Sequence, residues 1–260
     1  MGAGVRASVV IRAKNEGRFI GEALDAVFSQ RFGDGFEVVV VDSGSADGTL
    51  EIVRRYPLTL IEIPPASFTY GRSLNIGIAV ARGELIASLS AHSTPADEGW
   101  LGRLIEPFLE PKVAGVFGRQ LPRPNATPLE LLGMRLSGVM DERPRRHTRN
   151  PMFSNANGAF RRWLCTEVPF DEHVGGAEDL AWARLMLRAG YVIAYEPGAA
   201  VYHSHGEPLL KHLRRTLRDQ PTVLRSMLGL GSTPSPQPHL PQGEREPVPP
   251  SPLEGEGARG

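Results

Sequence analysis

One segment constrains the fold of this chain more than any other: an apolar run that leads directly into a short acidic turn containing glycine. It reads FEVVVVDSGSADGT from Phe36 to Thr49. Four consecutive valines are typical of a strand buried on both faces, as in a parallel sheet. Asp42 then falls at the carboxyl end of that strand, where open α/β sheets bind ligands. Small residues, Ser43 and Gly44, follow it, so a ligand can approach the backbone closely. The segment predicts a nucleotide pocket.

Length and charge narrow the class of protein. The chain has 260 residues and 41% hydrophobic content, which suits one α/β domain with a sizeable core. The formal net charge is zero, which argues against a general nucleic-acid binder. The single cysteine, Cys165, fits a reducing compartment and is expected to be a buried hydrophobe rather than a reactive thiol. Without a long apolar run, we expect a cytoplasmic protein, with peripheral contact at the inner face of the membrane left open.

Strand and helix patterns alternate through the first half of the chain. Strands are predicted at 7–11, 36–42, 58–63, 84–89 and 113–118, and helices at 21–30, 49–53, 73–81 and 98–109. This alternation predicts a Rossmann-like three-layer α/β/α sandwich with a mostly parallel sheet. Beyond residue 119 the pattern is looser, with helices expected at 128–140 and 177–189 and short strands at 191–195 and 199–203.

The expected organisation is one folded domain over 1–230 and a tail over 231–260. Within the domain, 1–118 is expected to form one half, 119–206 a second half, and 207–228 a basic amphipathic helix. That helix is either a solvated face or lies on an anionic membrane. The tail is mostly Pro, Gly, Ser and Glu, so we predict disorder, as an inert extension or a linker.

Two loops form the first candidate site. Arg12 and Lys14 follow the first strand and can hold phosphate charge, while Asp42 can accept hydrogen bonds from a base or a ribose. The alternative is that these are solvated loop charges. The first strand is not followed by Gly-x-Gly-x-x-Gly, which disfavours a dinucleotide-binding dehydrogenase.

Three further segments can carry chemistry. Gly71 and Arg72 precede a predicted helix and suit an anion, unless Ser73 merely caps that helix. Two glycines precede Glu178 and Asp179 at another helix start, where a carboxylate can act as a base or simply complement the helix dipole. Polar residues in the segment 153–159 suit a wall that binds sugar hydroxyls, or else form a structural turn.

These motifs, in this order, resemble the family 2 inverting glycosyltransferases of GT-A fold, and especially their bacterial rhamnosyltransferase-like members. The resemblance runs from about 7 to 205 and is clearest at VVIRAKNE, residues 9–16, and at 38–49. It implies that Asp179 is the general base, beside Glu178. The candidate acceptor contacts are Asn155 and Asn157, from their polar side chains, and Gly176, where a glycine leaves room for the acceptor. The nucleotide-sugar contacts that the resemblance implies are Arg12, Lys14, Glu16, Asp42, Ser43, Gly44, Arg72, Asn75, Ser90, Ala91 and His92.

The chain departs from the family at one motif. Most GT-A enzymes carry Asp-x-Asp where this chain has Ser90-Ala91-His92, a triplet that resembles the rhamnosyltransferase-like subgroup. Three interpretations stay open: His92 binds a divalent cation, Mn²⁺ or Mg²⁺; it contacts the diphosphate directly; or the site is degenerate. His203 or His205, which alternate at a strand end, are candidates to complete a metal site with His92, or are solvated.

The resemblance implies an inverting glycosyltransferase. The donor is expected to be dTDP-rhamnose or a UDP-sugar, bound by a nucleotide-sugar half over 1–118. The acceptor is expected to be a growing surface glycan or its lipid-linked precursor, bound by an acceptor half over 119–206, with the basic helix near the membrane if the acceptor is lipid-linked. Two other classes compete with this hypothesis. One is a non-catalytic nucleotide-sugar-binding module, motivated by the missing Asp-x-Asp. The other is a nucleotidyltransferase, which is disfavoured because the loop around Lys14 lacks the glycines that its chemistry needs.

Overall fold

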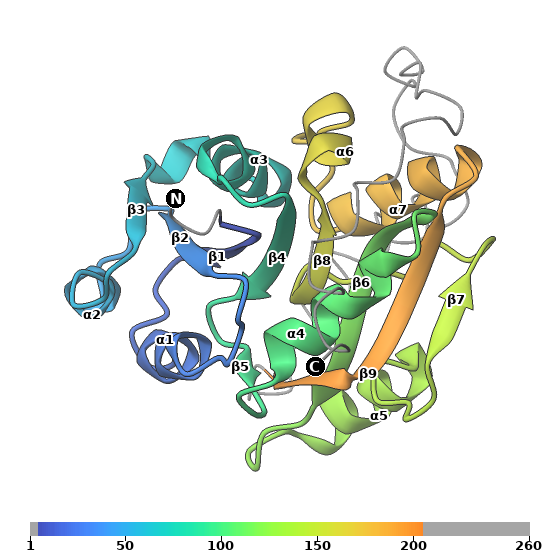
Figure 1. The fold of residues 1–260 in the computed structure, drawn as a ribbon. Coiled ribbons are helices and arrows are strands. Elements are labelled where there is room, and N and C mark those ends of the chain that lie inside the picture. Colours follow the sequence, from blue (N-terminus) through green and yellow to red (C-terminus); the bar gives the residue numbers. More distant parts are fainter. Residues whose placement is uncertain (1–4, 205–260) are drawn as a thin grey trace, which may run out of the picture.

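A computed structural model describes residues 5–204, which are organised around one mixed sheet (Figure 1). Within these residues the sheet has nine strands. In spatial order they are β3 (Thr59–Glu62), β2 (Phe36–Asp42), β1 (Ala7–Ala13), β4 (Leu85–Ser90), β8 (Asn157–Arg161), β6 (Val113–Leu121), β9 (Val192–Tyr202) and β5 (Thr94–Pro95), with β7 (Arg145–His147) paired to β9.

The sheet is mostly parallel, as predicted, and one reversed strand joins its two parts. β1 pairs in parallel with both β2 and β4, and β3 extends this unit from β2. β6 and β9 form a second parallel pair. β8 runs antiparallel to both β4 and β6 and so connects the two units.

Two apolar cores, one on each face of the sheet, explain the four-valine run. Val38 and Val40 belong to one core, and Val39 and Val41 to the other. Because successive side chains of a strand point to opposite faces, a strand covered on both sides needs apolar residues at every position. The expected three-layer architecture is therefore confirmed.

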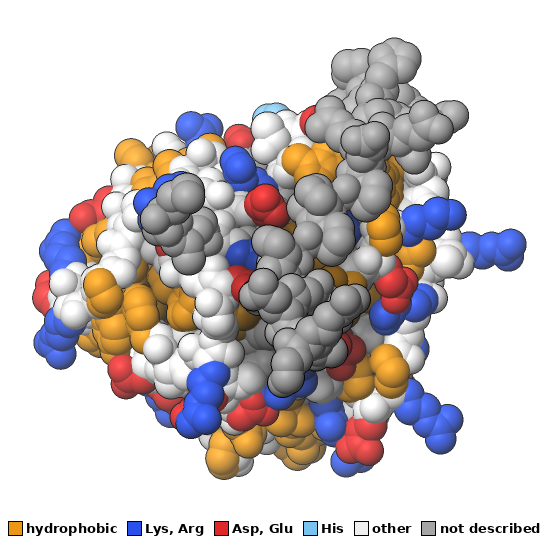
Figure 2. Space-filling view, in the orientation of Figure 1, with side chains coloured by type: hydrophobic (Ala, Val, Ile, Leu, Met, Phe, Trp, Pro, Cys, Tyr) orange, Lys and Arg blue, Asp and Glu red, His pale blue; other side chains and the backbone are white. Residues whose placement is uncertain are grey.

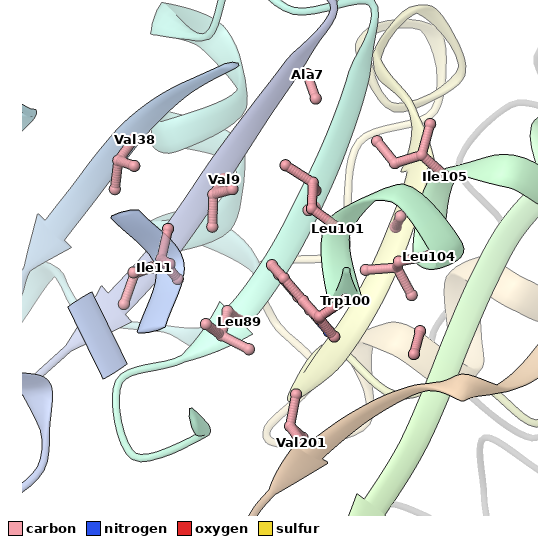
Figure 3. Close-up of a cluster of buried hydrophobic side chains, with 14 of the residues drawn as sticks. Ala7, Val9, Ile11, Val38, Leu89, Trp100, Leu101, Leu104, Ile105 and Val201 are labelled. Atoms are coloured by element: carbon pink, nitrogen blue, oxygen red, sulfur yellow. The ribbon is translucent and has the colours of Figure 1, made fainter. Parts of the chain in front are cut away.

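Helices cover both faces. The first core receives α1 (Ile20–Phe28), α2 (Thr49–Val53) and α4 (Trp100–Ile105), and Figure 3 shows α4 presenting Trp100 and Leu104 to the strands. The second core receives α3 (Tyr70–Val80), α6 (Arg162–Glu167) and α7 (Glu178–Arg188). Cys165 of α6 is buried there, as expected, and burial raises the pKa of its thiol well above the ordinary value.

Several element boundaries differ from the predictions. α3 begins three residues earlier than expected, because the Thr69 side chain accepts a hydrogen bond from the Arg72 amide at 3.0 Å. The alternative in which Ser73 caps this helix is therefore wrong. The helix predicted at 98–109 is a shorter α4 followed by the 3₁₀ helix η2 (Glu106–Leu109). A second 3₁₀ helix, η1 (Pro65–Ser67), precedes α3.

The later half holds elements that the sequence pattern did not reveal. β7, β8 and α6 were not expected, and the two short strands predicted near the end are one continuous β9. The helix α5 (Pro128–Ser137) was expected and starts with a capping box between Thr127 and Glu130.

Some predictions lie outside the described residues, namely the basic helix at 207–228, the tail at 231–260 and the role of His205. Among the helices that are described, none combines the length and the apolar character needed to cross a membrane. On the face shown in Figure 2, basic and acidic side chains are interspersed, in keeping with the zero net charge.

Candidate active site

Three strand ends bring the predicted site residues to one edge of the sheet. In the β1–β2 and β1–β4 registers, Arg12 lies beside Val41 and Ser90, and Ala13 lies beside Asp42. The parallel arrangement therefore assembles the loops that follow β1, β2 and β4, as the sequence predicted.

The Asp42 carboxylate is buried and shapes its own turn. Its Oδ1 accepts hydrogen bonds from the backbone amides of Gly44 and Ser45 at 2.9 and 2.8 Å. Its Oδ2 accepts a further bond from the Ser45 hydroxyl. Gly44 has φ of 79°, and a Cβ there would lie 2.4 Å from Cγ of Pro65, so this turn requires glycine. Contact between Asp42 and a nucleotide remains a prediction.

Asn15 and Asp47 link the loops after β1 and β2, a role that the sequence did not suggest. The Asn15 side-chain oxygen accepts from the Ala46 amide at 2.9 Å, and an Asp47 oxygen accepts from the Gly17 amide at 3.0 Å. Asn15 also has φ of 55°, which asparagine tolerates better than most residues. The two loops therefore form a single cross-linked unit.

Arg12 is held by two groups of the protein itself. Its Nη1 donates to Oε1 of Glu178 at 2.9 Å and to the carbonyl oxygen of Tyr70 at 3.0 Å. Lys14 places its ammonium 5.7 Å from the centre of the Phe68 ring. The structure thus joins Arg12 to the predicted base motif on α7.

Asp179 lies in the first turn of α7, where two backbone amides hold its carboxylate. Asn155 donates to Oδ2 at 3.2 Å and Leu180 to Oδ1 at 2.8 Å. Burial, and after it the neighbouring Glu178 charge, raise the pKa of Asp179 to about 7, against the opposing effect of the two amides and Arg12. A carboxyl group with a pKa near neutrality is suited to take up a proton at physiological pH.

Two histidines face each other beside this edge. His92 and His203 place their Nε2 atoms 3.1 Å apart. Each Nδ1 lies 2.9 Å from an oxygen: Oε1 of Glu16 for His92, and Oε1 of Gln120 for His203. The Gln120 amide nitrogen donates to Ser154 at 3.0 Å, which leaves the Gln120 oxygen as the acceptor.

The oxygens beside the two Nδ1 atoms can accept a hydrogen from each ring. In that tautomer the facing Nε2 atoms can share a proton or bind one metal ion. Metal–imidazole bonds of about 2.0–2.1 Å put adjacent ligand nitrogens about 3 Å apart, so the observed pair fits two ligands of one ion. Within residues 5–204 no group of three or more His, Cys, Asp or Glu side chains is positioned to hold a metal. A complete metal site would therefore need ligands in addition to this pair.

A pocket of about 640 Å³ brings Asp179 and His203 together. Gln120, Ser154 and Gly176 also line it. Its apolar wall comes largely from α5 and the segment before β8: Met134, Leu136, Val139, Met152, Phe153 and Leu180. His147 of β7 also lines the pocket and was missed, because nothing in the local sequence marks so short a strand.

Two predicted site residues have structural contacts instead. Asn157 is completely buried; its oxygen accepts from the Trp100 indole at 2.9 Å, and its nitrogen donates to the carbonyls of Ala199 and Arg119. An amide so enclosed cannot form the expected acceptor wall, so that expectation is corrected. Asn75 exchanges hydrogen bonds with the Phe170 backbone and also donates to Glu172, which ties α3 to the segment before α7.

The remaining predicted contacts are distributed around the edge. Arg72 is exposed on the first turn of α3, and Ser90 is half-buried at the end of β4. Ala91 is buried in the first core, and the Ser43 hydroxyl is buried with no hydrogen-bond partner in the structure. Gly71 packs closely, since a Cβ there would lie 2.4 Å from the Asp171 carbonyl oxygen.

The mixed sheet, the strand-edge loops and the carboxylate on α7 define a GT-A glycosyltransferase domain. The family model for glycosyl transferase family 2 matches residues 8–165, more than half of the chain. The chain belongs to that family.

Curated relatives are modestly similar. An O-antigen chain rhamnosyltransferase of Salmonella typhimurium is 28% identical over 211 residues, which cover 77% of this chain and 67% of that protein. An O-antigen chain rhamnosyltransferase of Salmonella anatum is 30% identical over 178 residues, covering 65% of this chain and 56% of that protein. The chain therefore spans between about half and two thirds of these relatives.

Solved structures share the fold. The mannosyltransferase of Pyrobaculum calidifontis in complex with GDP-Man and Mn²⁺ superposes with a TM-score of 0.67 at 24% identity. That match covers 88% of this chain and 66% of the mannosyltransferase chain. The GT-A fold implied by the sequence is confirmed.

Proposed function

We propose that this chain transfers a sugar from a nucleotide-diphosphate donor to an acceptor hydroxyl with inversion, and that Asp179 is the general base. One observation carries the proposal. A carboxyl group whose pKa is raised to about 7 lines a pocket of about 640 Å³, together with a histidine of the facing pair. Family membership supports the reaction class.

The step requires one proton transfer and one displacement at carbon. Asp179 takes the proton of the acceptor hydroxyl while that oxygen forms a bond to C1 of the donor sugar. The bond between C1 and the diphosphate oxygen breaks at the same time, and the nucleoside diphosphate leaves with the electron pair. Attack opposite the leaving group inverts the anomeric centre.

His92 and His203 are proposed to hold a divalent cation, with Glu16 and Gln120 orienting the two rings. Such an ion supplies charge neutralisation at the departing diphosphate. Imidazole ligands favour Mn²⁺ over Mg²⁺, and the Mn²⁺ in the mannosyltransferase complex supports this choice.

The donor loops are proposed to be those after β1, β2 and β4, with 1–118 as the donor half and 119–206 as the acceptor half. The rhamnosyltransferase relatives support a deoxysugar donor such as dTDP-rhamnose, although the mannosyltransferase complex contains GDP-Man, so a donor screen must include other nucleotides. The same relatives support a surface glycan, or its lipid-linked precursor, as acceptor.

The decisive experiment measures nucleoside diphosphate release from dTDP-rhamnose, UDP-sugars and GDP-sugars, with candidate acceptors and with Mn²⁺ or EDTA. We expect release by the wild-type chain with one donor, and loss of release in Asp179→Asn. Nucleotide binding without release from any donor would favour the non-catalytic binding module. Release that EDTA does not affect would contradict the metal at His92 and His203.

A further inference from the structure

The ion pair between Arg12 and Glu178 is unusually enclosed. Its side chains are 12% and 4% exposed, and the N–O distance is 2.9 Å. Every other arginine–carboxylate pair in the described part of the chain has at least one partner more than a third exposed. Burying such a pair costs desolvation energy, so a pair of this kind is weak evidence for stability alone.

Asn155 joins the pair to Asp179. Its side-chain amide donates to the same Glu178 oxygen that Arg12 contacts, at 3.2 Å. Its backbone amide donates to Oδ2 of Asp179, also at 3.2 Å. One residue therefore fixes both carboxylates of the Glu178–Asp179 motif relative to each other.

Arg12 is anchored from its own side as well. Its guanidinium also donates to the Tyr70 carbonyl and lies 5.5 Å from the centre of the Tyr70 ring. Its backbone is held in β1 between β2 and β4. The arginine is thus a fixed positive charge against Glu178, which in turn is the nearest like charge to Asp179.

We propose that Arg12 is a positioning residue for the Asp179 base, acting through Glu178, rather than a nucleotide contact. The Glu178 charge favours protonated Asp179, and Arg12 compensates that charge. In this way the Arg12–Glu178 pair keeps the proton affinity of Asp179 suited to a base near neutral pH. Asn155, which also contacts Glu178, orients the Asp179 carboxylate. This inference deepens the proposed function and rests on it for the role of Asp179.

Other ionisable groups face the same pocket and must stay constant in a test. They are Glu130 of α5, Arg145 and His147 of β7, and His203 after β9. Glu130 is held in the capping box with Thr127, and Arg145 pairs with Asp141. Burial and then the Arg145 charge lower the pKa of His147, so it is neutral at pH 7.

The test follows the Asp179 carboxyl carbon by NMR in the full chain without substrate, and Asp179→Asn identifies the signal. Arg12→Gln is expected to raise the Asp179 pKa by about one unit, because it removes a nearby opposite charge. Glu178→Gln is expected to lower it by a similar amount. The double variant restores charge balance and is expected to bring the pKa back within roughly half a unit of wild type.

Arg82→Gln is the matched control, because Arg82 pairs with the partly buried Glu37 at the opposite ends of the strands. It should leave the Asp179 titration unchanged. If a single variant does not fold, the Asp179 titration is measured in Arg12→Lys and in the double variant instead, because both keep the charge balance of the pair. Arg12→Lys should titrate close to wild type.

The inference fails if Arg12→Gln leaves the Asp179 titration unchanged and instead weakens binding of UDP, GDP and dTDP, which would make Arg12 a nucleotide contact. It also fails if the effects of Arg12→Gln and Glu178→Gln on the pKa are of the same sign. A chain in which the variants show the expected titrations but the wild type transfers no sugar would overturn the proposed function, while the coupling of Arg12 and Glu178 to Asp179 would still hold.

Discussion

The loops after β1 and β2 and the α7 site are held together in different ways. In the Asp42 turn, the carboxylate bonds to amides two and three residues away, and Asn15 and Asp47 cross-link the two loops. In the α7 site, Glu178 meets Arg12 from 166 positions away, and His92 meets His203 from 111 positions away. The Asp42 turn is therefore determined by contacts between residues close in sequence, whereas the α7 site forms only when distant strands are in place.

The substitution Asp179→Asn tests most directly whether the α7 site and these loops have separate roles. The substitution removes the proposed base while leaving the donor loops intact, so the transfer rate should fall by about 10³-fold with nucleotide affinity unchanged. Rates come from nucleoside diphosphate release and affinities from calorimetric titration. Asp34→Asn, at an exposed pair with Arg6, is the control and should keep full activity. Equal rates for Asp179→Asn and wild type would refute the base assignment.

Asn157→Ala tests the corrected assignment of that residue. The change leaves the Trp100 indole and two carbonyl groups unpaired in a buried site, and should cost about 3 kcal/mol of unfolding free energy. Denaturant unfolding measures it. A variant with unchanged stability and a raised KM for the acceptor would instead show that Asn157 contacts the acceptor.

His203→Ala tests the facing pair. Loss of one imidazole should weaken Mn²⁺ binding by at least about tenfold, measured by electron paramagnetic resonance of free Mn²⁺ without any sugar nucleotide. His173→Ala, at an exposed residue before α7, is the control and should bind Mn²⁺ like wild type. Unchanged Mn²⁺ affinity in His203→Ala would mean that the pair shares a proton rather than a metal.

Gly44→Ala probes the locally encoded turn. A methyl group would lie 2.4 Å from the Pro65 ring at a φ of 79°, so the variant should lose about 2 kcal/mol of stability and bind nucleotide more weakly. Gly48→Ala is a matched control, because Gly48 also has positive φ but open space around its Cβ position. Its loss should be about 1 kcal/mol. Similar losses for both would show that strain, not the proline contact, dominates.

The smallest expected effect is on the pH dependence of stability. The folded pKa of Asp179, about 7, lies above the ordinary value near ~4 that it takes in the unfolded chain. Its contribution to stability is therefore complete below about pH 4 and is lost as the pH rises through about 7. On the order of 1–2 kcal/mol is expected, since the carboxylate lines an open pocket. Thermal unfolding of Asp179→Asn should depend less on pH over this window; an unaltered profile would contradict the raised pKa.

Much of the fold could be predicted because short-range sequence patterns indicate the strands and helices of its first half. The valines at 38–41 encode a strand covered on both faces, and the turn at Asp42 and Gly44 encodes where it ends. β8 could not be predicted in the same way. It lies between β4 and β6, and its residues 157–161 show no strand signal that distinguishes them from the polar segment before them.

The candidate site was predictable in part. Glu178, Asp179 and His92 could be singled out because each belongs to a short motif with a chemical meaning, although their roles remain predictions. Arg12 was assigned to the phosphate because a basic residue after a strand is ambiguous until its partner is known. Asn157 was misassigned because an amide suits a sugar hydroxyl and a buried indole equally well.

By itself, the sequence determined the layered α/β architecture, the parallel unit formed by β1 to β4 and the edge of the sheet at which the candidate site lies. These follow from side-chain alternation and turn geometry, which act over a few residues. Only the tertiary structure decided that Arg12 faces Glu178, that His92 faces His203 and that α5 walls the pocket of Asp179. Electrostatic and hydrogen-bonding partners are set by distances in space, and those distances become defined only after the strands have paired.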